Sequence, residues 1–239
     1  MRMVVLFNEW LTFTLILLGI WCAIFIAKPL LRKKMMGAGV LTAPFGLTEP
    51  LFIPAYWNPP SLFNLAASTG FDLESIIFSF AIGGIGVVLY DTVFATKHAK
   101  VSHHEMLDNL HRFHKLALAA PIIVFLPLLL LTKLNPIYSS SISMFVGGIA
   151  AILCRPDLRG RTVGGGVLFL ALYFAFFLSF NLAYPGFVQR VWNLAALSGA
   201  LVLGVPLEEL VFAFTFGMMW SGVYEHLTWS KTVGRGKTA

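Results

Sequence analysis

The chain has 239 residues, of which 58% are hydrophobic and 12% charged, with a net charge of +6. A soluble domain of this length carries roughly twice that charged fraction. The composition therefore excludes a protein that faces water on all sides and predicts one embedded in a lipid bilayer. The two cysteines, Cys22 and Cys154, lie in apolar runs, which indicates small core residues rather than a disulfide framework or a metal knuckle.

Seven segments of the chain are candidates for membrane-spanning helices, each of which needs about 20 mostly apolar residues. They cover residues 4–27, 37–54, 75–95, 116–132, 138–154, 163–183 and 205–227. The second segment is the weakest, because Pro44, Glu49 and Pro50 interrupt it. The sequence thus predicts an all-α membrane protein with seven transmembrane helices.

The basic residues predict how the chain is oriented. Fourteen of the 17 lysines and arginines follow the first, third, fifth and seventh segments, whereas Arg2, Lys133 and Arg190 fall in the other loops. Because cytoplasmic loops are enriched in Lys and Arg, we expect a cell-membrane protein with an outside N-terminus and a cytoplasmic C-terminus. This distribution explains the net charge without a nucleic-acid partner.

An internal repeat is visible along the chain. Residues 28–41 align without gaps with residues 155–168, and residues 73–80 align with residues 207–214. Further matched pairs are Gly83 with Gly217, Tyr90 with Tyr224, and Asp91 with Glu225. The first three helices thus repeat as the last three and run in the same direction. This predicts a parallel internal repeat, with the site at the interface of its halves.

The repeat also predicts how the chain is divided. Residues 1–115 are expected to form the first three-helix repeat and a cytoplasmic loop, residues 116–137 a connector helix, and residues 138–239 the second repeat.

Four buried glutamates are the candidate acid–base residues, since carboxylates inside a bilayer are costly and mark function by default. Glu208 and Glu74 occupy matched positions in the two copies, and we expect both to face inward. Glu209 projects about 100° away from Glu208 on the helix, and Glu49 lies in the interrupted second segment. Both are expected to support the first pair.

A structural alternative stays open for these acids: a buried carboxylate can cap a helix end or pair with an arginine. This alternative is favoured for Glu209, Asp72 and Asp91. Asp91 and its counterpart Glu225 are expected to serve as partners of the basic loops.

The second copy carries a family resemblance. Residues 206–212 read Pro-Leu-Glu-Glu-Leu-Val-Phe and are followed by Tyr224-Glu225, which is similar to the signature of the small integral-membrane lycopene cyclases. These are the heterodimeric type of some bacteria and the fused domain of archaeal and fungal enzymes. The resemblance covers most of the chain as two tandem units. The first copy departs from the motif, because Glu74 lacks both the preceding proline and the second glutamate.

The resemblance implies a redox-neutral reaction on a hydrophobic isoprenoid. A protonated carboxylic acid adds a proton to a terminal double bond of a linear carotenoid, a neighbouring alkene attacks the carbocation, and a base removes a proton to leave a ring. Aromatic faces stabilise such cations. We expect the substrate to be lined by Phe212, Phe78, Trp57, Trp192 and Tyr56. No nucleotide-binding motif is present, so no cofactor is implied.

Other functions of such a fold stay open, namely hydration or cyclisation of another isoprenoid, carotenoid or lipid binding, and proton-coupled transport. A homo-oligomer also stays open. A retinal protein is excluded, because residues 205–227 contain no lysine.

The histidines suggest a metal site only weakly. Five of them crowd one loop and His226 stands apart; the five are His98, His103, His104, His111 and His114. Three of these, His104, His111 and His114, could share a helix face. We nevertheless expect a polar loop near lipid headgroups and no metal.

Overall fold

A computed structural model describes residues 8–106 and 108–233 of the chain. These residues form two compact units, and four of the five boundaries between the units fall inside helices, the exception being the one between residues 134 and 135. The first unit contains residues 8–85, 135–137 and 172–210, and the second contains residues 86–106, 108–134, 138–171 and 211–233. The units do not follow the expected division into repeats, which stays a prediction.

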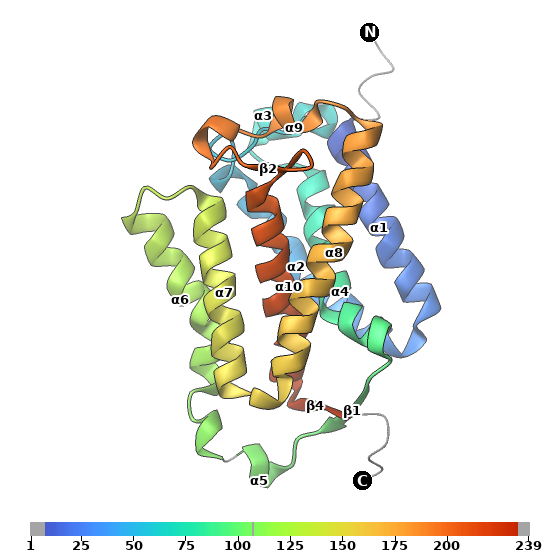
Figure 1. Ribbon diagram of the computed structural model, residues 1–239, viewed down its shortest axis with the longest axis vertical. Coiled ribbons are helices and arrows are strands. Elements are labelled where there is room, and N and C mark those ends of the chain that lie inside the picture. Colours follow the sequence, from blue (N-terminus) through green and yellow to red (C-terminus); the bar gives the residue numbers. More distant parts are fainter. Residues whose placement is uncertain (1–7, 107, 234–239) are drawn as a thin grey trace. The chain divides into compact units, whose positions relative to one another are not determined.

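Five helices among the described residues are long and apolar enough to cross a membrane (Figure 1). They are α1 (Glu9–Ala27), α4 (Leu73–Phe94), α6 (His114–Leu131), α7 (Pro136–Cys154) and α8 (Arg159–Ala183), the last preceded by the 3-10 turn η5 (Pro156–Leu158). The chain is thus a helical membrane protein, and five of the predicted spans are confirmed as apolar helices.

The count of seven transmembrane helices is not confirmed. The predicted span 205–227 is a helix, α10 (Leu207–Thr228), but its three glutamates make it less apolar than the other five. The predicted span 37–54 is not one helix: α2 (Arg32–Thr42) gives way to the 3-10 segment η2 (Ala43–Leu51). Two prolines in that segment remove backbone donors and explain the break.

Short elements complete the first unit. They are η1 (Pro29–Leu31), η3 (Leu62–Asn64), α3 (Leu65–Thr69), α9 (Phe187–Val191), η6 (Leu194–Ala196), β2 (Leu201–Val202) and β3 (Val205–Pro206). Strands β2 and β3 pair antiparallel directly before α10. Glycines bring η2 close to α4: a Cβ on Gly46 would lie 2.5 Å from the backbone nitrogen of Ile76. The start of α4 is therefore held against η2.

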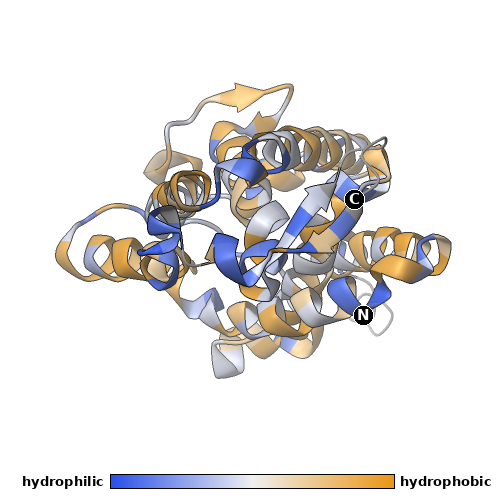
Figure 2. Cartoon of the chain, turned by 90° about the horizontal axis from the view of Figure 1, so that it is seen from below, coloured by the Kyte–Doolittle hydropathy of each residue, from blue (hydrophilic) through white to orange (hydrophobic). Residues whose placement is uncertain are grey.

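The second unit contains a second pair of strands. β1 (Lys97–Lys100) pairs antiparallel with β4 (Ser230–Val233), and α5 (His103–Met106) and η4 (Asn109–His111) follow β1. The two short strand pairs are an addition to the expected all-α architecture. Figure 2 shows that the helices are mostly hydrophobic, whereas hydrophilic residues concentrate in β1, β4 and the connecting segments.

Matched positions of the two sequence copies have similar local geometry. Lys28 precedes η1 with φ −125° and ψ 72°, and Arg155 precedes η5 with φ −132° and ψ 76°. In the first copy Gly39 lies against the ring of Phe80, and in the second copy the glycine at the matched position, 166, lies against the ring at 214. The copies therefore share both a turn and a close helix contact.

Candidate active site

Glu209 lies at the centre of a group of aromatic donors in the first unit. Its carboxylate is 5% exposed. One oxygen accepts hydrogen bonds from the Tyr56 hydroxyl and from the Trp192 indole, the latter at 3.0 Å. The other accepts from the Tyr173 hydroxyl at 2.9 Å. Glu209 thus neither caps a helix nor pairs with arginine, contrary to the favoured alternative.

A backbone pairing positions two of these donors. Trp57 and Trp192 form an antiparallel β-bridge, in which the Asn58 nitrogen donates to the Val191 oxygen at 2.8 Å and the Asn193 nitrogen to the Tyr56 oxygen at 2.9 Å. The bridge joins the Trp-containing stretches of the two copies. It holds the side chains of Tyr56 and Trp192 on either side of one carboxylate.

The protonation of Tyr56 follows from this arrangement. Tyr56 lies in the loop between η2 and η3, outside the apolar helices, and is 4% exposed. Burial and the neighbouring Glu209 carboxylate raise the pKa of the Tyr56 hydroxyl well above its ordinary value. The hydroxyl therefore stays protonated and remains a donor to Glu209.

Glu74 and Glu208 hold the loops that precede their helices. Both are buried, at 0% and 4% exposed. One oxygen of Glu74 accepts from the Leu62 backbone nitrogen at 2.6 Å and from the Asn8 amide at 2.8 Å. One oxygen of Glu208 accepts from the Ser198 backbone nitrogen at 2.9 Å. Both matched glutamates thus accept a hydrogen bond from a backbone nitrogen of the preceding segment, twelve residues earlier for Glu74 and ten residues earlier for Glu208.

Glu49 and Asp72 lie near the start of α4. Glu49 is 6% exposed, and the side chains of Ser75 and Trp57 lie near its carboxylate. Asp72 accepts from the Ser75 backbone nitrogen at 2.5 Å and so caps α4, as the structural alternative anticipates. Among the described residues, no ion pair involves Glu49, Asp72, Glu74 or Glu209.

Aromatic rings surround this group of acids within the first unit. Phe78, expected to line the substrate, lies 5.3 Å from Trp10 and 6.5 Å from Tyr173 between ring centroids. Trp57 meets Trp10 edge-on at 4.6 Å. Four of the five expected substrate-lining residues therefore belong to the first unit. The fifth, Phe212, belongs to the second unit and stacks on Phe216.

The sequence analysis missed Tyr173, Trp10 and Asn8. The sequence could have indicated Tyr173, because its hydroxyl lies in an otherwise apolar segment and a buried tyrosine hydroxyl needs a hydrogen-bond partner. Asn8 accepts from the Leu11 nitrogen as the cap of α1 and donates to Glu74. No pattern in the sequence connects it with a residue 66 positions away.

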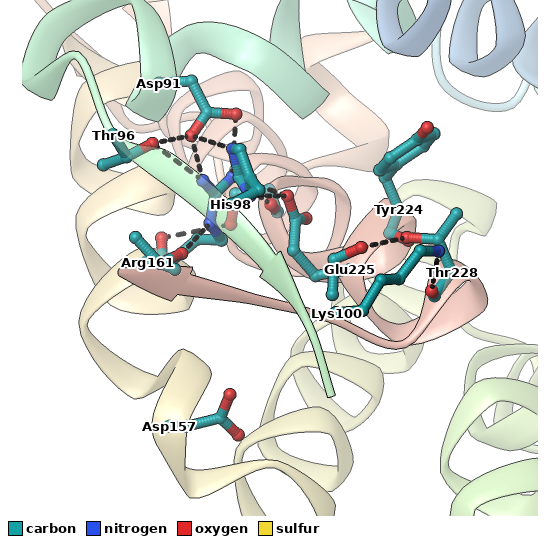
Figure 3. A network of polar contacts seen from close by, with 12 residues as sticks. Asp91, Thr96, His98, Lys100, Asp157, Arg161, Tyr224, Glu225 and Thr228 are labelled. Atoms are coloured by element: carbon teal, nitrogen blue, oxygen red, sulfur yellow. Dashed lines mark hydrogen bonds and ion pairs between the residues drawn. The ribbon is translucent and has the colours of Figure 1, made fainter. Parts of the chain in front are cut away.

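A second polar cluster lies in the second unit (Figure 3). The Arg161 guanidinium pairs with Asp91 and lies 3.4 Å from the Glu225 carboxylate, and His98 contacts both acids at 3.2 and 3.5 Å. Arg161, Asp91 and Glu225 are buried. The Arg161 guanidinium pairs with both acids, which favours a structural role for this cluster, as expected for Asp91 and Glu225.

A surface groove of about 440 Å³ lies elsewhere in the first unit. Its lining includes Glu9 and Arg190, which form an ion pair at 2.5 Å, and Asn58. None of the candidate acids lines it. The groove therefore borders the Trp57–Trp192 bridge through Asn58 and Val191, without contact to the candidate acids.

Comparison with known proteins gives one match. Residues 135–227 match the sequence model of the lycopene cyclase family, and this range contains Tyr173, Trp192, Glu208 and Glu209. No match was found among curated proteins or among solved structures. The match does not extend to the first copy, so the tandem arrangement stays a prediction. Residues 135–227 are therefore similar to the lycopene cyclase family.

Proposed function

We propose that this protein is a membrane enzyme that cyclises a linear carotenoid or a related isoprenoid in a redox-neutral, proton-initiated reaction. One observation carries the proposal: a buried carboxylate, Glu209, accepts hydrogen bonds from three aromatic donors, and Glu209 and two of these donors, Tyr173 and Trp192, lie within the family-matching part of the chain. Electron-rich rings and a carboxylate are the groups that stabilise a carbocation in a water-poor site.

The contacts favour different roles for the neighbouring acids. Glu209 accepts three hydrogen bonds from aromatic side chains, which hold its carboxylate among electron-rich rings. We therefore assign to Glu209 the stabilisation of positive charge and the final removal of a proton. Glu208 and Glu74, which accept from backbone and amide groups of the preceding segments, are the proposed proton donors. Glu49 is a further supporting acid.

The reaction needs no redox partner. A proton passes from a glutamic acid to a terminal alkene carbon, and the electron pair of a second alkene closes the ring on the resulting cation. The final carbocation then loses a proton to a carboxylate, so that the enzyme regains the proton it gave. Protons and electrons balance with the protein's own acids and a substrate of unchanged composition.

We also propose the tandem repeat with its site between the copies. The matched turns at Lys28 and Arg155, the matched contact at Gly39 and the bridge between Trp57 and Trp192 support it. The bridge brings residues of both copies to Glu209, because Tyr56 comes from the first copy and Trp192 from the second.

The test is expression in a lycopene-accumulating bacterium, with extracted pigments separated by chromatography. We expect one- or two-ringed products from the natural chain. Glu209→Gln removes the charge while keeping the size of the side chain, and should lower product formation by at least about 100-fold, as for loss of an electrostatic or acid–base group. Glu208→Gln and Glu74→Gln test the proton donors.

Glu105→Gln is the matched control, since Glu105 is exposed and pairs with Lys231 at 2.8 Å. It should leave product formation unchanged. Each variant is checked for insertion into the membrane by immunoblot of the membrane fraction. Unchanged lycopene with a well-inserted natural chain would reject lycopene as the substrate and leave another isoprenoid, or the carrier function, as the next assay.

A further inference from the structure

A cluster of histidine and cysteine side chains lies in the second unit, apart from the residues assigned to cyclisation. His114, at the start of α6, and His226, in the last turn of α10, lie with Cys154, the last residue of α7. The possible ligand atoms of these three residues all lie within 4.8 Å of one another. His111, in η4, adds a fourth: its Nδ1 is 3.9 Å from the Cys154 sulfur. We propose that these four side chains bind a zinc ion.

The spacing of the ligand atoms fits one tetrahedral metal. Zinc binds cysteine sulfur at about 2.3 Å and histidine nitrogen at about 2.1 Å, so two such ligands on a tetrahedron are about 3.6 Å apart. The Cys154 sulfur lies 3.6 Å from the His114 Nδ1 and 3.9 Å from the His111 Nδ1. Both histidine nitrogens thus lie at about the distance from the cysteine sulfur that a shared tetrahedral metal requires.

His226 is oriented as a metal ligand. It is 1% exposed, and its Nε2 lies 3.3 Å from the Ala151 carbonyl oxygen. Since a carbonyl only accepts, Nε2 carries the hydrogen, and Nδ1 keeps a lone pair. That Nδ1 is buried and has no hydrogen-bond partner among the described residues. A histidine that donates one ring nitrogen to a carbonyl and offers the other is the arrangement that metal sites use.

Neighbouring groups hold the ligands and balance charge. The Trp229 ring stacks on His114 at 4.1 Å and meets His111 edge-on at 5.2 Å, which fixes both imidazoles. The nearby Arg155 guanidinium donates to Asp157 at 2.8 and 2.6 Å, so its charge is already countered. Cysteine and imidazole ligands without carboxylates favour zinc over magnesium or calcium.

Such a site joins four segments of the second unit, namely η4, α6, α7 and α10. With four protein ligands it leaves no open position, which is the pattern of structural zinc rather than catalytic zinc. Its role would be to fix the histidine-rich loop to the ends of three helices. From the sequence, His104, His111 and His114 are expected to lie in a polar loop near lipid headgroups without a metal, and no sequence pattern links Cys154 to them.

The test uses the full chain purified in detergent after expression with added zinc sulfate. We expect about one zinc per chain by mass spectrometry after dialysis against metal-free buffer. Cys154→Ser and His226→Gln should each weaken zinc binding by more than about 100-fold, since changes behind the ligands alone cost 10- to 100-fold. Cys22→Ser and His103→Gln are the matched controls, because both residues are exposed, and they should retain the zinc.

A second measurement uses the natural chain, so that its result does not depend on whether a variant folds. Bound zinc should protect Cys154 from alkylation by a maleimide, and a chelator should expose it, while Cys22 reacts equally in both conditions. Cobalt in place of zinc should give a sulfur-to-metal absorption band that Cys154→Ser lacks. Absence of zinc in the folded natural chain, or equal alkylation of Cys154 with and without chelator, would overturn the proposal.

Discussion

At the scale of single residues, the two neighbouring acids Glu208 and Glu209 have different hydrogen-bond partners, which favour different roles. Glu208 and Glu209 are adjacent in α10, yet Glu208 accepts from a backbone nitrogen of the preceding loop and Glu209 from three aromatic side chains. Sequence periodicity alone favoured Glu208 as the inward-facing acid. Because of its three aromatic hydrogen-bond donors, Glu209 takes a larger part in the proposed reaction than the sequence suggested.

Tyr173→Phe should lower the rate of ring formation by about 10- to 100-fold. The change removes one hydrogen-bond donor to the buried Glu209 carboxyl without changing the ring, and leaving a buried acceptor without its partner costs about 1–3 kcal/mol. The measurement is the initial rate of product formation in isolated membranes. Tyr184→Phe is the control, because that ring packs on Phe180 and its hydroxyl has no partner among the described residues. Equal rates in the two variants would contradict the role of Tyr173.

At the scale of elements, the interruption of the predicted span 37–54 is part of the packed structure of the first unit. The 3-10 segment η2 carries Glu49 and lies against the start of α4, where Asp72 caps the helix. A regular helix over residues 37–54 would need backbone donors that Pro44 and Pro50 lack. The break therefore serves to bring two short segments with buried acids together.

Gly46→Ala should destabilise the protein by about 1–3 kcal/mol, the usual cost of overpacking. Its Cβ would lie 2.5 Å from a backbone atom of α4, which cannot move aside as a side chain can. Gly37→Ala, in α2, is the control: a Cβ there has nothing within 4 Å, and alanine favours helix. Thermal unfolding in detergent should show a lower midpoint for Gly46→Ala only.

Arg161→Gln should destabilise the second unit by about 3–5 kcal/mol, because it leaves the buried carboxylates of Asp91 and Glu225 without the guanidinium that pairs them. Arg159→Gln, at an exposed position of the same helix, should have little effect. Unfolding by denaturant in detergent measures both. Unchanged stability of Arg161→Gln would contradict the structural role of its ion pairs with Asp91 and Glu225.

At the scale of the whole molecule, the chain is a helical membrane protein, and its residues 135–227 match the lycopene cyclase family model. Its basic residues follow alternate predicted spans, and the positive-inside rule predicts a cytoplasmic C-terminus. α10 contains the family motif and is long enough to cross the bilayer, about 30 Å thick, at 1.5 Å per residue. We expect it to span although it carries three acids.

A green fluorescent protein fused to the C-terminus should fluoresce in bacterial cells, because it folds in the cytoplasm and not after export in unfolded form. Alkaline phosphatase at the same position should be inactive. A dark fluorescent-protein fusion together with an active phosphatase fusion would place the C-terminus outside the cell. That outcome would contradict the expected orientation, in which an odd number of spans connects an outside N-terminus to a cytoplasmic C-terminus.

Sequence alone predicted the membrane class, five of the apolar helices, the resemblance to lycopene cyclases that residues 135–227 match, and the set of buried acids. These depend on composition, on runs of about 20 residues and on one short motif, all of which are local along the chain. The tertiary structure decided which groups meet: Tyr56 and Tyr173 at Glu209, Arg161 between two acids, and Cys154 beside three histidines. Such contacts join residues far apart in the chain, and packing rather than spacing sets them.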